Sequence, residues 1–392
     1  MNRLDELIKE FCPDGVDFEK IKDVYKRLKG TPITAGKMKE IENPNGEIRI
    51  FAGGKTVINS IESDIPKANI TRVPSVLIQS RGVIDVIYYD DPFTFKNEMW
   101  AYTHKDRIAV KYLYYVLKSK LQDLREAASG MGALPQISLA VTETLEIPFP
   151  PLPVQREIVR ILDNFTELTA ELTAELTARK KQYEYYRRNL LKCGGCVSLV
   201  ELGDIAEFKY GFTDTAKIEG NAKFIRITDI LENGKLNKNE NKYIDLTEES
   251  KKYLLSKGDI LVARTGATYG KTMLFNDSFP SVYASFLIRI RFKKNTILPE
   301  YYWHFAQSSL YWQQANKLVS KAGQPQFNAN VLKAVKIPMP SIDFQRRIVN
   351  VLDRFDALCN DITIGLPAEI EARQKQYEYY RDKLLTFKEK QV

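Results

Sequence analysis

The same distinctive segment occurs twice in this chain. Residues 147–165 begin with Ile-Pro-Phe-Pro and continue, four residues later, with Gln-Arg-Glu-Ile-Val-Arg-Ile-Leu-Asp-Asn-Phe. Residues 337–355 repeat the pattern as Ile-Pro-Met-Pro and Gln-Arg-Arg-Ile-Val-Asn-Val-Leu-Asp-Arg-Phe. Pro148 and Pro338 are 338 − 148 = 190 residues apart, which is too long for a solenoid repeat and suits one domain plus one long helix. The chain is therefore a duplicated protein.

The duplication extends beyond this segment. Gln-Tyr-Glu-Tyr-Tyr-Arg occupies residues 182–187 and again residues 376–381. Weaker matches align residues 12–24 with 193–205, 76–82 with 260–266, 110–115 with 299–304, and 135–137 with 325–327. Similar helices thus alternate with divergent domains, which suggests that the two domains recognise different things. The first alignment also places the chain start near the end of a repeat, as though a cyclic arrangement had been cut there.

Composition favours a folded protein with a polyanionic partner. The 392 residues are 44% hydrophobic and 11% aromatic, enough for two sizeable cores. A net charge of +8 and a pI near 9.0 favour nucleic acid as that partner. No run approaches the roughly 18 apolar residues that span a bilayer, and residues 1–6 open an amphipathic helix rather than a signal peptide. We therefore expect a cytoplasmic protein.

The pattern along the chain predicts five segments. We expect an N-terminal helix over residues 1–15, because apolar residues recur at helical spacing and stop at Pro13-Asp14-Gly15. Short β-like runs such as 48–51 and 85–89 mix with turn residues and one helix, which is typical of an α+β domain. The segments are a helix (1–15), a first α+β domain (16–147), a long helix (148–192), a second α+β domain (193–336) and a second long helix (337–392).

The two long helices are coiled-coil candidates. From Ile158 to Leu190, apolar residues step by threes and fours or twice that, and the same pattern recurs from Ile348 to Leu384. Gly365-Leu366-Pro367 should kink or break the second helix. Antiparallel packing of the two helices would give a pseudo-two-fold pair of basic domains, which matches two half-sites on duplex DNA because the duplex has the same symmetry.

The first long helix contains a tetrapeptide repeat. Residues 166–178 read Thr-Glu-Leu, then Thr-Ala-Glu-Leu twice, then Thr-Ala. Each unit adds about 6 Å and keeps leucine nearly on one face. One interpretation is a spacer that measures a distance, and the other is a simple helix-forming repeat without a metric role.

Together these motifs resemble the DNA-specificity subunits of Type I restriction-modification systems. The likeness rests on the duplicated P-x-P…Q-x-x-I-V-x-x-L-D-x-F helix start, the duplicated Q-Y-E-Y-Y-R helix end, the Thr-Ala-Glu-Leu units and Gly-Asp-Ile-Leu-Val-Ala-Arg-Thr-Gly at residues 258–266. It covers the whole chain. The resemblance implies two target-recognition domains that each read half of a bipartite DNA site, with the helices as a ruler whose Thr-Ala-Glu-Leu units set the gap.

The resemblance also implies the partners. Two modification (methyltransferase) subunits would bind the helices, and restriction (endonuclease-motor) subunits would complete the complex. Catalysis and S-adenosylmethionine would belong to those partners, so no cofactor is expected in this chain.

No catalytic or metal-binding motif in the sequence is complete. Asp90-Asp91-Pro92-Phe93 lacks the second proline of an adenine methyltransferase loop. Residues 266–272 resemble a phosphate-binding loop but are one residue short between the glycines. Cys193 and Cys196 would need two more zinc ligands, and the chain has 2 histidines. We therefore predict neither a catalytic residue nor a metal site.

Candidate contact residues follow from residue type and loop position. Base reading needs directional donors on loops or helix ends, whereas phosphate contacts need Lys, Arg or backbone N–H groups. The DNA-binding candidates are Lys37, Lys55, Arg81, Lys96, Gln136, Tyr210, Thr213, Arg264, Thr265, Tyr269, Lys271, Lys321, Gln324 and Gln326. The aromatic clusters at 112–115 and 301–303 favour core positions instead. Three tyrosines within four positions cannot all point into one seam between two helices. The candidates for contacts with the methyltransferase subunits or for packing at the helix ends are therefore Tyr185, Tyr186, Tyr379 and Tyr380.

Three alternatives remain open on sequence alone. In the first, the chain is a coiled-coil adaptor whose domains bind proteins. In the second it is an enzyme in its own right, and in the third it is a specificity protein of a related phage-defence system. Salt-dependent DNA affinity distinguishes the first from a DNA-binding protein, and a methylation assay on the single chain tests the second.

Overall fold

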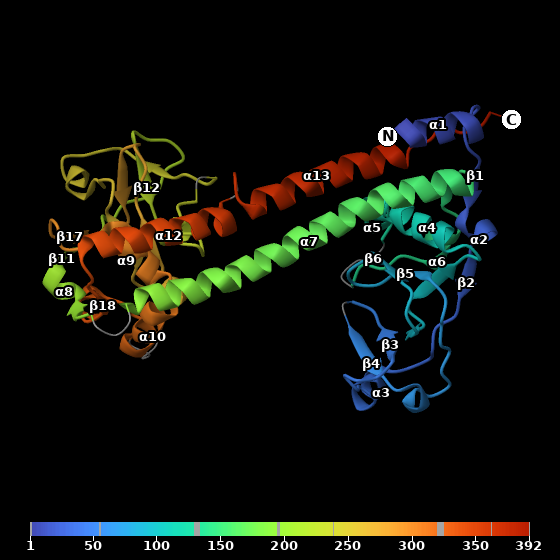
Figure 1. Cartoon of the computed structure of the whole chain (residues 1–392), viewed down its shortest axis with the longest axis horizontal. Helices are drawn as coiled ribbons and strands as arrows, with labels where there is room; N and C mark the ends of the chain where they lie inside the picture. Colours follow the sequence, from blue (N-terminus) through green and yellow to red (C-terminus); the bar gives the residue numbers. More distant parts are fainter. Residues whose placement is uncertain are drawn as a thin grey trace. The chain divides into compact units, whose positions relative to one another are not determined.

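The computed structural model (Figure 1) describes residues 2–54, 56–128, 134–193, 197–237, 239–319, 325–361 and 363–391. It divides into two compact units. Unit 1 comprises residues 1–171 and 371–392, and unit 2 comprises residues 172–370. Each unit contains one α+β domain together with parts of the long helices.

The first α+β domain has two main sheets. Its elements are β1 (Phe18–Lys20), α2 (Ile21–Val24), β2 (Lys26–Leu28), α3 (Ala35–Glu40), β3 (Ile48–Phe51), β4 (Val57–Ser60), β5 (Ser75–Gln79), β6 (Asp85–Tyr89), β7 (Phe93–Phe95), β8 (Trp100–Thr103), α4 (Arg107–Ser119), α5 (Leu121–Glu126), α6 (Leu139–Glu143) and β9 (Glu146–Pro148). One sheet has the order β2-β8-β5-β6 and the other β4-β3-β7, while β1 pairs with β9. Helix α4 packs on the first sheet, which buries its apolar face.

The second domain repeats this topology strand for strand. Its elements are β10 (Leu199–Glu201), α8 (Leu202–Ile205), β11 (Ala206–Tyr210), β12 (Ala222–Ile225), β13 (Tyr243–Ile244), β14 (Ile260–Ala263), β15 (Thr272–Leu274), β16 (Ser281–Tyr283), β17 (Leu287–Phe292), α9 (Pro299–Ala306), α10 (Ser309–Leu318), α11 (Ala329–Lys333) and β18 (Lys336–Pro338). The sheets are ordered β11-β17-β14-β15 and β13-β12-β16, and β10 pairs with β18. The duplication seen in the sequence is therefore a duplication of the fold.

Buried aromatic residues hold the same position in both copies. The Tyr112 hydroxyl donates to the Pro148 carbonyl at 3.1 Å, and the Tyr301 hydroxyl donates to the Pro338 carbonyl at 3.0 Å. Both tyrosines are fully buried. The prediction that these aromatic clusters lie in the core is confirmed, and each anchors the domain to the strand that precedes a long helix.

The first long helix is continuous and the second is broken. Helix α7 spans Leu152–Leu191, whereas the second spacer consists of α12 (Ile342–Asn360) and α13 (Leu366–Leu384). The break that Gly365 and its neighbours predicted is therefore present, and the single helix expected over 337–392 is replaced by two. Asp361 organises the break: its carboxylate accepts the Thr363 N–H at 2.7 Å and its carbonyl accepts the Gly365 N–H at 3.1 Å.

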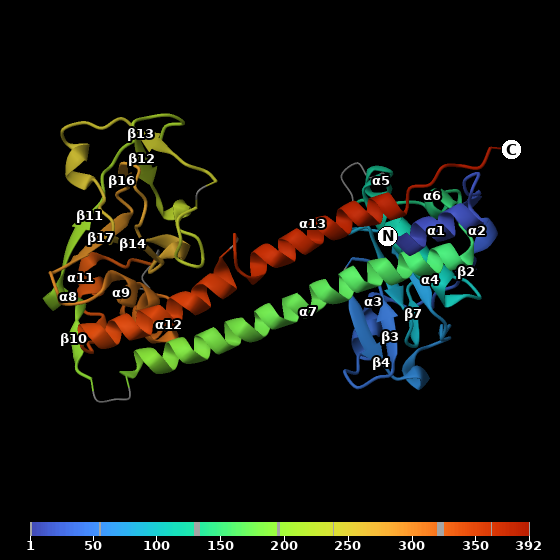
Figure 2. The same cartoon turned by 45° about the horizontal axis from the view of Figure 1, so that its top comes forward.

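Within each unit, α7 packs beside a returning helix. In unit 1 the last part of α13 lies beside the first part of α7, and in unit 2 α12 lies beside the last part of α7; Figures 1 and 2 agree on both. The Phe165 and Tyr380 rings stack in unit 1, and Tyr183 and Tyr186 both stack on Phe355 in unit 2. The helices run antiparallel in each unit, as the apolar seam predicted.

The two chain ends meet in unit 1. The Val16 N–H donates to the Lys388 carbonyl at 2.9 Å, and the Lys390 N–H donates back to the Val16 carbonyl at 3.0 Å. Leu384 shares a buried core with Leu4 of α1 (Asn2–Phe11). These contacts close the cyclic arrangement that the sequence alignment suggested.

Candidate nucleic-acid interface

In unit 2, the candidate interface is centred on an arginine that lies between two aromatic rings. The Arg264 guanidinium carbon lies 5.2 Å from the Tyr210 ring centre and 5.6 Å from the Phe286 ring centre. Its Nε donates to the Ser285 carbonyl at 2.9 Å. Tyr210 is 43% exposed and Phe286 is 51% exposed. The arginine is therefore held in place by its neighbours while the site stays open to solvent.

Loops far apart in the sequence converge on this arginine. Thr265 forms an isolated antiparallel bridge with Gln326, and the Phe327 N–H donates to the Arg264 carbonyl at 2.7 Å. The Tyr210 hydroxyl accepts the Ala329 N–H at 3.1 Å. Four candidate residues thus meet in one place, and together with Phe286 we call them the Arg264 cluster: Tyr210, Arg264, Thr265, Phe286 and Gln326.

The remaining candidates of unit 2 make other contacts or lie outside the described residues. The Tyr269 hydroxyl donates to Asn316 Oδ1 at 2.8 Å, and its ring contacts Trp312. Lys271 is ion-paired with Glu232. Thr213 is exposed in the loop after β11. Lys321 and Gln324 lie outside the described residues.

In unit 1 the candidates gather around a glutamate that sequence reasoning missed. Lys96 Nζ lies 3.0 Å from Glu98 Oε2, and Glu98 Oε1 accepts the Gly53 N–H at 3.0 Å. Partial burial acts to raise the pKa of Glu98, but the hydrogen bonds from Lys96 and Gly53, with the charges of Lys96 and Arg81, lower it below its ordinary value. The carboxylate is thus kept ionised among cations.

Arg81 acts on Glu98 through its charge, and Arg81 pairs with Gln136 as Thr265 pairs with Gln326 in unit 2. Arg81 forms an isolated antiparallel bridge with Gln136, and the Gly82 N–H donates to the Pro135 carbonyl at 2.8 Å. We call Arg81, Lys96, Glu98 and Gln136 the Glu98 cluster. Lys37 does not join it, since it lies on α3 and pairs with Glu40 at 2.7 Å. Lys55 lies outside the described residues.

The two clusters occupy equivalent positions on the duplicated fold. Ile78 of β5 faces Trp100 of β8, and Val262 of β14 faces Ile288 of β17. This register places Glu98 and Phe286 at the same position, two residues before Trp100 and Ile288. Arg81 likewise corresponds to Thr265, because both form the bridge to a glutamine. One scaffold therefore presents a charged set in unit 1 and an aromatic set in unit 2.

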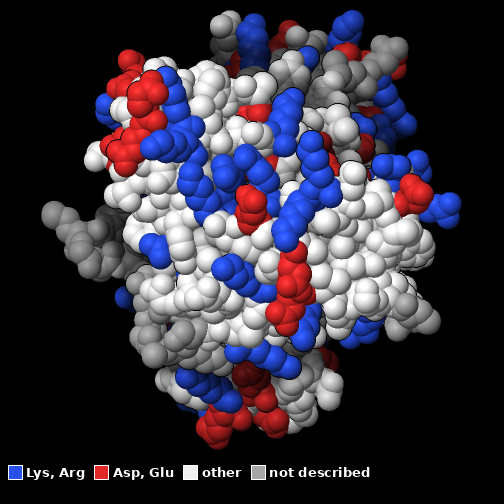
Figure 3. Space-filling model, turned by 90° about the vertical axis from the view of Figure 1, so that its left-hand side faces the viewer, with Lys and Arg blue, Asp and Glu red and all other residues white. Residues whose placement is uncertain are grey.

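Basic side chains also gather on one face of unit 2. Figure 3 looks at the face that carries β11 and β17, and Lys and Arg collect in its middle. Lys209 of β11 lies close to further cations: partial burial lowers the pKa of Lys209, and the charges of Arg289, Lys252 and Arg291 lower it further.

Three of the four candidate partner-binding tyrosines are exposed on the helices, and Tyr185 and Tyr379 are the most exposed. Tyr185 is 65% exposed and Tyr379 is 61% exposed. Tyr186 and Tyr380 instead stack on Phe355 and Phe165, each with ring centres 5.5 Å apart. The first pair is therefore available to another molecule, and the second pair holds helices together.

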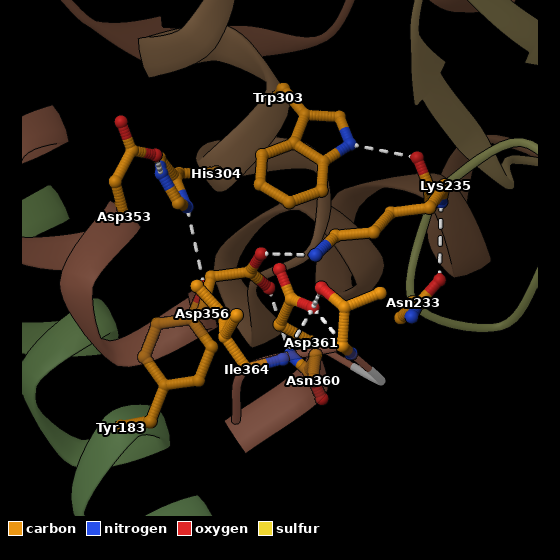
Figure 4. A network of polar contacts seen from close by, with 12 residues as sticks. Tyr183, Asn233, Lys235, Trp303, His304, Asp353, Asp356, Asn360, Asp361 and Ile364 are labelled. Carbon is orange, nitrogen blue, oxygen red and sulfur yellow. Dashed lines mark hydrogen bonds and ion pairs between the residues drawn. The ribbon is translucent and has the colours of Figure 1, made fainter. Parts of the chain in front are cut away.

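A polar network joins the domain of unit 2 to α12 (Figure 4). Lys235 Nζ lies 2.7 Å from Asp356 Oδ2, and Asn360 Nδ2 donates to Asp356 Oδ1 at 2.8 Å. The Trp303 indole N–H donates to the Gly234 carbonyl at 3.1 Å. In the first copy, Thr166 occupies the position of Asp356, so the ion pair with Lys235 belongs to unit 2.

The described residues carry no sign of a metal or membrane site. Across these ranges, no group of three or more His, Cys, Asp or Glu side chains is placed to hold a metal ion. None of the helices described is long and apolar enough to cross a membrane.

Comparison with known proteins identifies the family. Residues 13–179 and 197–372 each match the Type I restriction modification DNA specificity domain. A putative type I restriction enzyme specificity subunit of Haemophilus influenzae is 36% identical over 314 residues, covering 74% of this chain and 77% of that protein. The EcoR124I/EcoR124II specificity subunit of Escherichia coli is 36% identical over 301 residues, 72% of each chain. The chain therefore belongs to the family of Type I restriction-modification DNA specificity subunits, with two copies of the specificity domain.

Solved structures share the fold. The S subunit of a Type I restriction-modification system from M. genitalium superposes with a TM-score of 0.62 at 18% identity, covering 95% of this chain and 96% of that one. A chain from a study of type I complex assembly and conformational transition gives a TM-score of 0.58 at 16% identity, covering 95% and 98%. The α+β fold with two repeats and a long helix is thus confirmed.

Proposed function

We propose that this chain selects the DNA sequence on which a Type I restriction-modification complex acts, with each α+β domain reading one half of a bipartite site. The observation that carries the proposal is the pair of equivalent clusters on a duplicated fold. Their backbone hydrogen bonds match, yet glutamate stands in one where phenylalanine stands in the other. Equal scaffolds with different side chains suit two different half-sites.

The side chains fit base edges in the major groove. Arginine donates two hydrogen bonds to guanine, glutamine pairs with adenine, glutamate accepts from the cytosine amino group, and apolar rings contact the thymine methyl group. Arg264 and Gln326 are such readers in unit 2, and Glu98 and Gln136 in unit 1. Further candidates would contact phosphate or sugar, which fixes register without reading sequence: Lys37, Lys55, Thr213, Tyr269, Lys271, Lys321 and Gln324.

The helices serve assembly rather than chemistry. The exposed Tyr185 and Tyr379 occupy equivalent helix positions, which supports docking of two methyltransferase subunits at repeated sites. Those subunits would bind S-adenosylmethionine, restriction subunits would complete the complex, and this chain would be a non-catalytic, cytoplasmic component. The antiparallel helix packing within each unit supports the role of α7 as a spacer, with its Thr-Ala-Glu-Leu units setting the gap between half-sites.

The test is methylome sequencing of a host that expresses this chain with its methyltransferase subunit. We expect a new bipartite methylated motif with a fixed gap, and a changed gap after deletion of Thr173–Leu176, one Thr-Ala-Glu-Leu unit. An assembled complex with an active methyltransferase subunit that adds no motif would contradict the proposal and favour the protein-binding adaptor. Methylation by this chain alone would instead show that it is an enzyme.

A further inference from the structure

Two cations face each other across paired strands of unit 2. Lys209 of β11 is directly opposite Arg289 of β17, and both side chains are half-buried. The Lys209 ammonium donates to the Lys252 carbonyl at 2.8 Å and lies 4.3 Å from the centre of the Tyr253 ring. The Arg289 guanidinium carbon lies 5.7 Å from the Tyr283 ring centre. Like charges opposite each other destabilise a sheet, so this arrangement weakens the protein unless an anion joins it.

Among the described residues, no carboxylate is ion-paired with either cation of the pair. In the part of the chain that the structure describes, no Asp or Glu forms an ion pair with Lys209, Lys252 or Arg289. The neighbouring Arg291 differs, because it is ion-paired with Asp259 at 2.7 Å. Partial burial lowers the pKa of Lys209, and the charges of Arg289, Lys252 and Arg291 lower it further. The positive charge of Lys209, Lys252 and Arg289 is therefore concentrated, and none of the three has an ion-pair partner among the described residues.

The first copy of the domain shows that the fold does not need these charges. In the equivalent strands of unit 1, Leu28 of β2 is opposite Ala101 of β8. These residues pack in an apolar cluster with Phe95, which stands where Tyr283 stands in unit 2. At the same position of the same sheet, unit 1 thus has two apolar residues and unit 2 has two cations, although Leu261 and Tyr283 beside them still belong to an apolar core. The charges in unit 2 serve something other than folding.

We propose that Lys209, Lys252 and Arg289 bind one phosphate group of the DNA backbone. The inference rests on the proposed DNA-binding function and adds a contact that none of the loop candidates supplies. Phosphate oxygens accept charge-assisted hydrogen bonds from ammonium and guanidinium groups, which are stronger than neutral ones. The Tyr253 ring lies against the Lys209 ammonium and the Tyr283 ring near the Arg289 guanidinium, which orients the two cations before the anion arrives. Lys and Arg side chains gather on the face of unit 2 that Figure 3 shows, which suits a polyanion.

The experiment compares salt dependence of DNA binding. The chain is assembled with its methyltransferase subunits, and affinity for a duplex with the methylated motif is measured over a range of salt concentrations. The double variant Lys209→Leu/Arg289→Ala installs the residues of unit 1. We expect the slope of log affinity against log salt to become shallower by about 0.9, the value for one lost phosphate contact. The control is Lys217→Leu, an exposed lysine paired with Asp245, which should leave the slope unchanged.

A second measurement separates folding from binding. Because a like-charge pair is removed, the double variant should unfold at a higher temperature than the unchanged chain, and it should methylate the same motif. An unchanged salt slope would overturn the inference while leaving the proposed function intact. Free inorganic phosphate that stabilises only the unchanged chain, with equal slopes, would assign the site to free phosphate and also overturn it. Failure of the unchanged complex to bind DNA would overturn both proposals.

Discussion

Phe165 and Tyr380 stack with ring centres 5.5 Å apart and planes inclined by 21°. Their counterparts in the other copy, Phe355 and Tyr186, stack at 5.5 Å and 24°. One contact thus occurs twice, once in each unit, at the seam between α7 and a returning helix. Phe355 differs in one respect, since Tyr183 stacks on it as well, at 5.9 Å and 9°.

This difference predicts unequal effects of matched substitutions. Phe165→Leu removes one stacked pair and Phe355→Leu removes two, and each pair contributes about 1 kcal/mol beyond the buried area. We therefore expect the second variant to lose roughly 1 kcal/mol more than the first. Hydrogen exchange of α7 amides measures this, with faster exchange confined to residues before 171 in the first variant and after 172 in the second. Equal losses in the two variants would contradict a stacking contribution.

The backbone conformation of Gly266 predicts that its substitution alters the recognition of one half-site only. Its φ is +70°, a left-handed conformation that a side chain disfavours by about 1–3 kcal/mol, and its N–H donates to the Pro325 carbonyl at 3.3 Å. Gly266→Ala should shift the Thr265 and Gln326 loops, so that the complex methylates a motif relaxed in one half only. Methylome sequencing measures it. The matched variant Gly82→Ala, at φ +77°, should relax the other half, and relaxation of the same half by both variants would refute the assignment.

The sequence was sufficient for the fold but only partly for the site. The repeated motifs predicted two copies, the spacing of apolar residues predicted the long helices, and Gly365 predicted their break. Each of these is a local signal. Sequence reasoning missed Glu98, Phe286 and Arg289, because their roles depend on how the strands are paired. The sequence around Arg289 does not indicate that this residue is opposite Lys209. The signal that finds them is the equivalence of β8 and β17, which becomes visible only through their register with β5 and β14.

The ion pair between Lys235 and Asp356 predicts that a second substitution restores the stability lost through the first. Lys235→Met leaves the Asp356 carboxylate, which is 11% exposed, without its cation, and an unpaired buried charge is costly. We expect a loss of about 1–3 kcal/mol in the stability of unit 2. Adding Asp356→Thr, which installs the residue found at position 166, should recover most of it. Urea unfolding followed by tryptophan fluorescence, to which Trp303 and Trp312 contribute from unit 2, measures both, and a double variant no more stable than the single one would contradict an ion-pair role.

The lowered pKa of Glu98 predicts that the stability of unit 1 depends on pH. Its pKa lies below the ordinary value of 4.5, where the hydrogen bonds from Lys96 and Gly53 outweigh burial. A carboxyl whose pKa is lowered on folding stabilises the protein fully above the unfolded pKa and loses that effect as pH falls through the folded one. The difference in unfolding free energy between the unchanged chain and Glu98→Gln should therefore be constant at neutral pH and shrink below about pH 4.5. Glu40→Gln is the control, because Glu40 is exposed and pairs with Lys37 on its own helix, and its difference should stay small throughout. A Glu98→Gln difference that stays constant from neutral pH to pH 3 would show that the carboxylate is not held by these cations, and the Glu98 cluster would lose its charged reader.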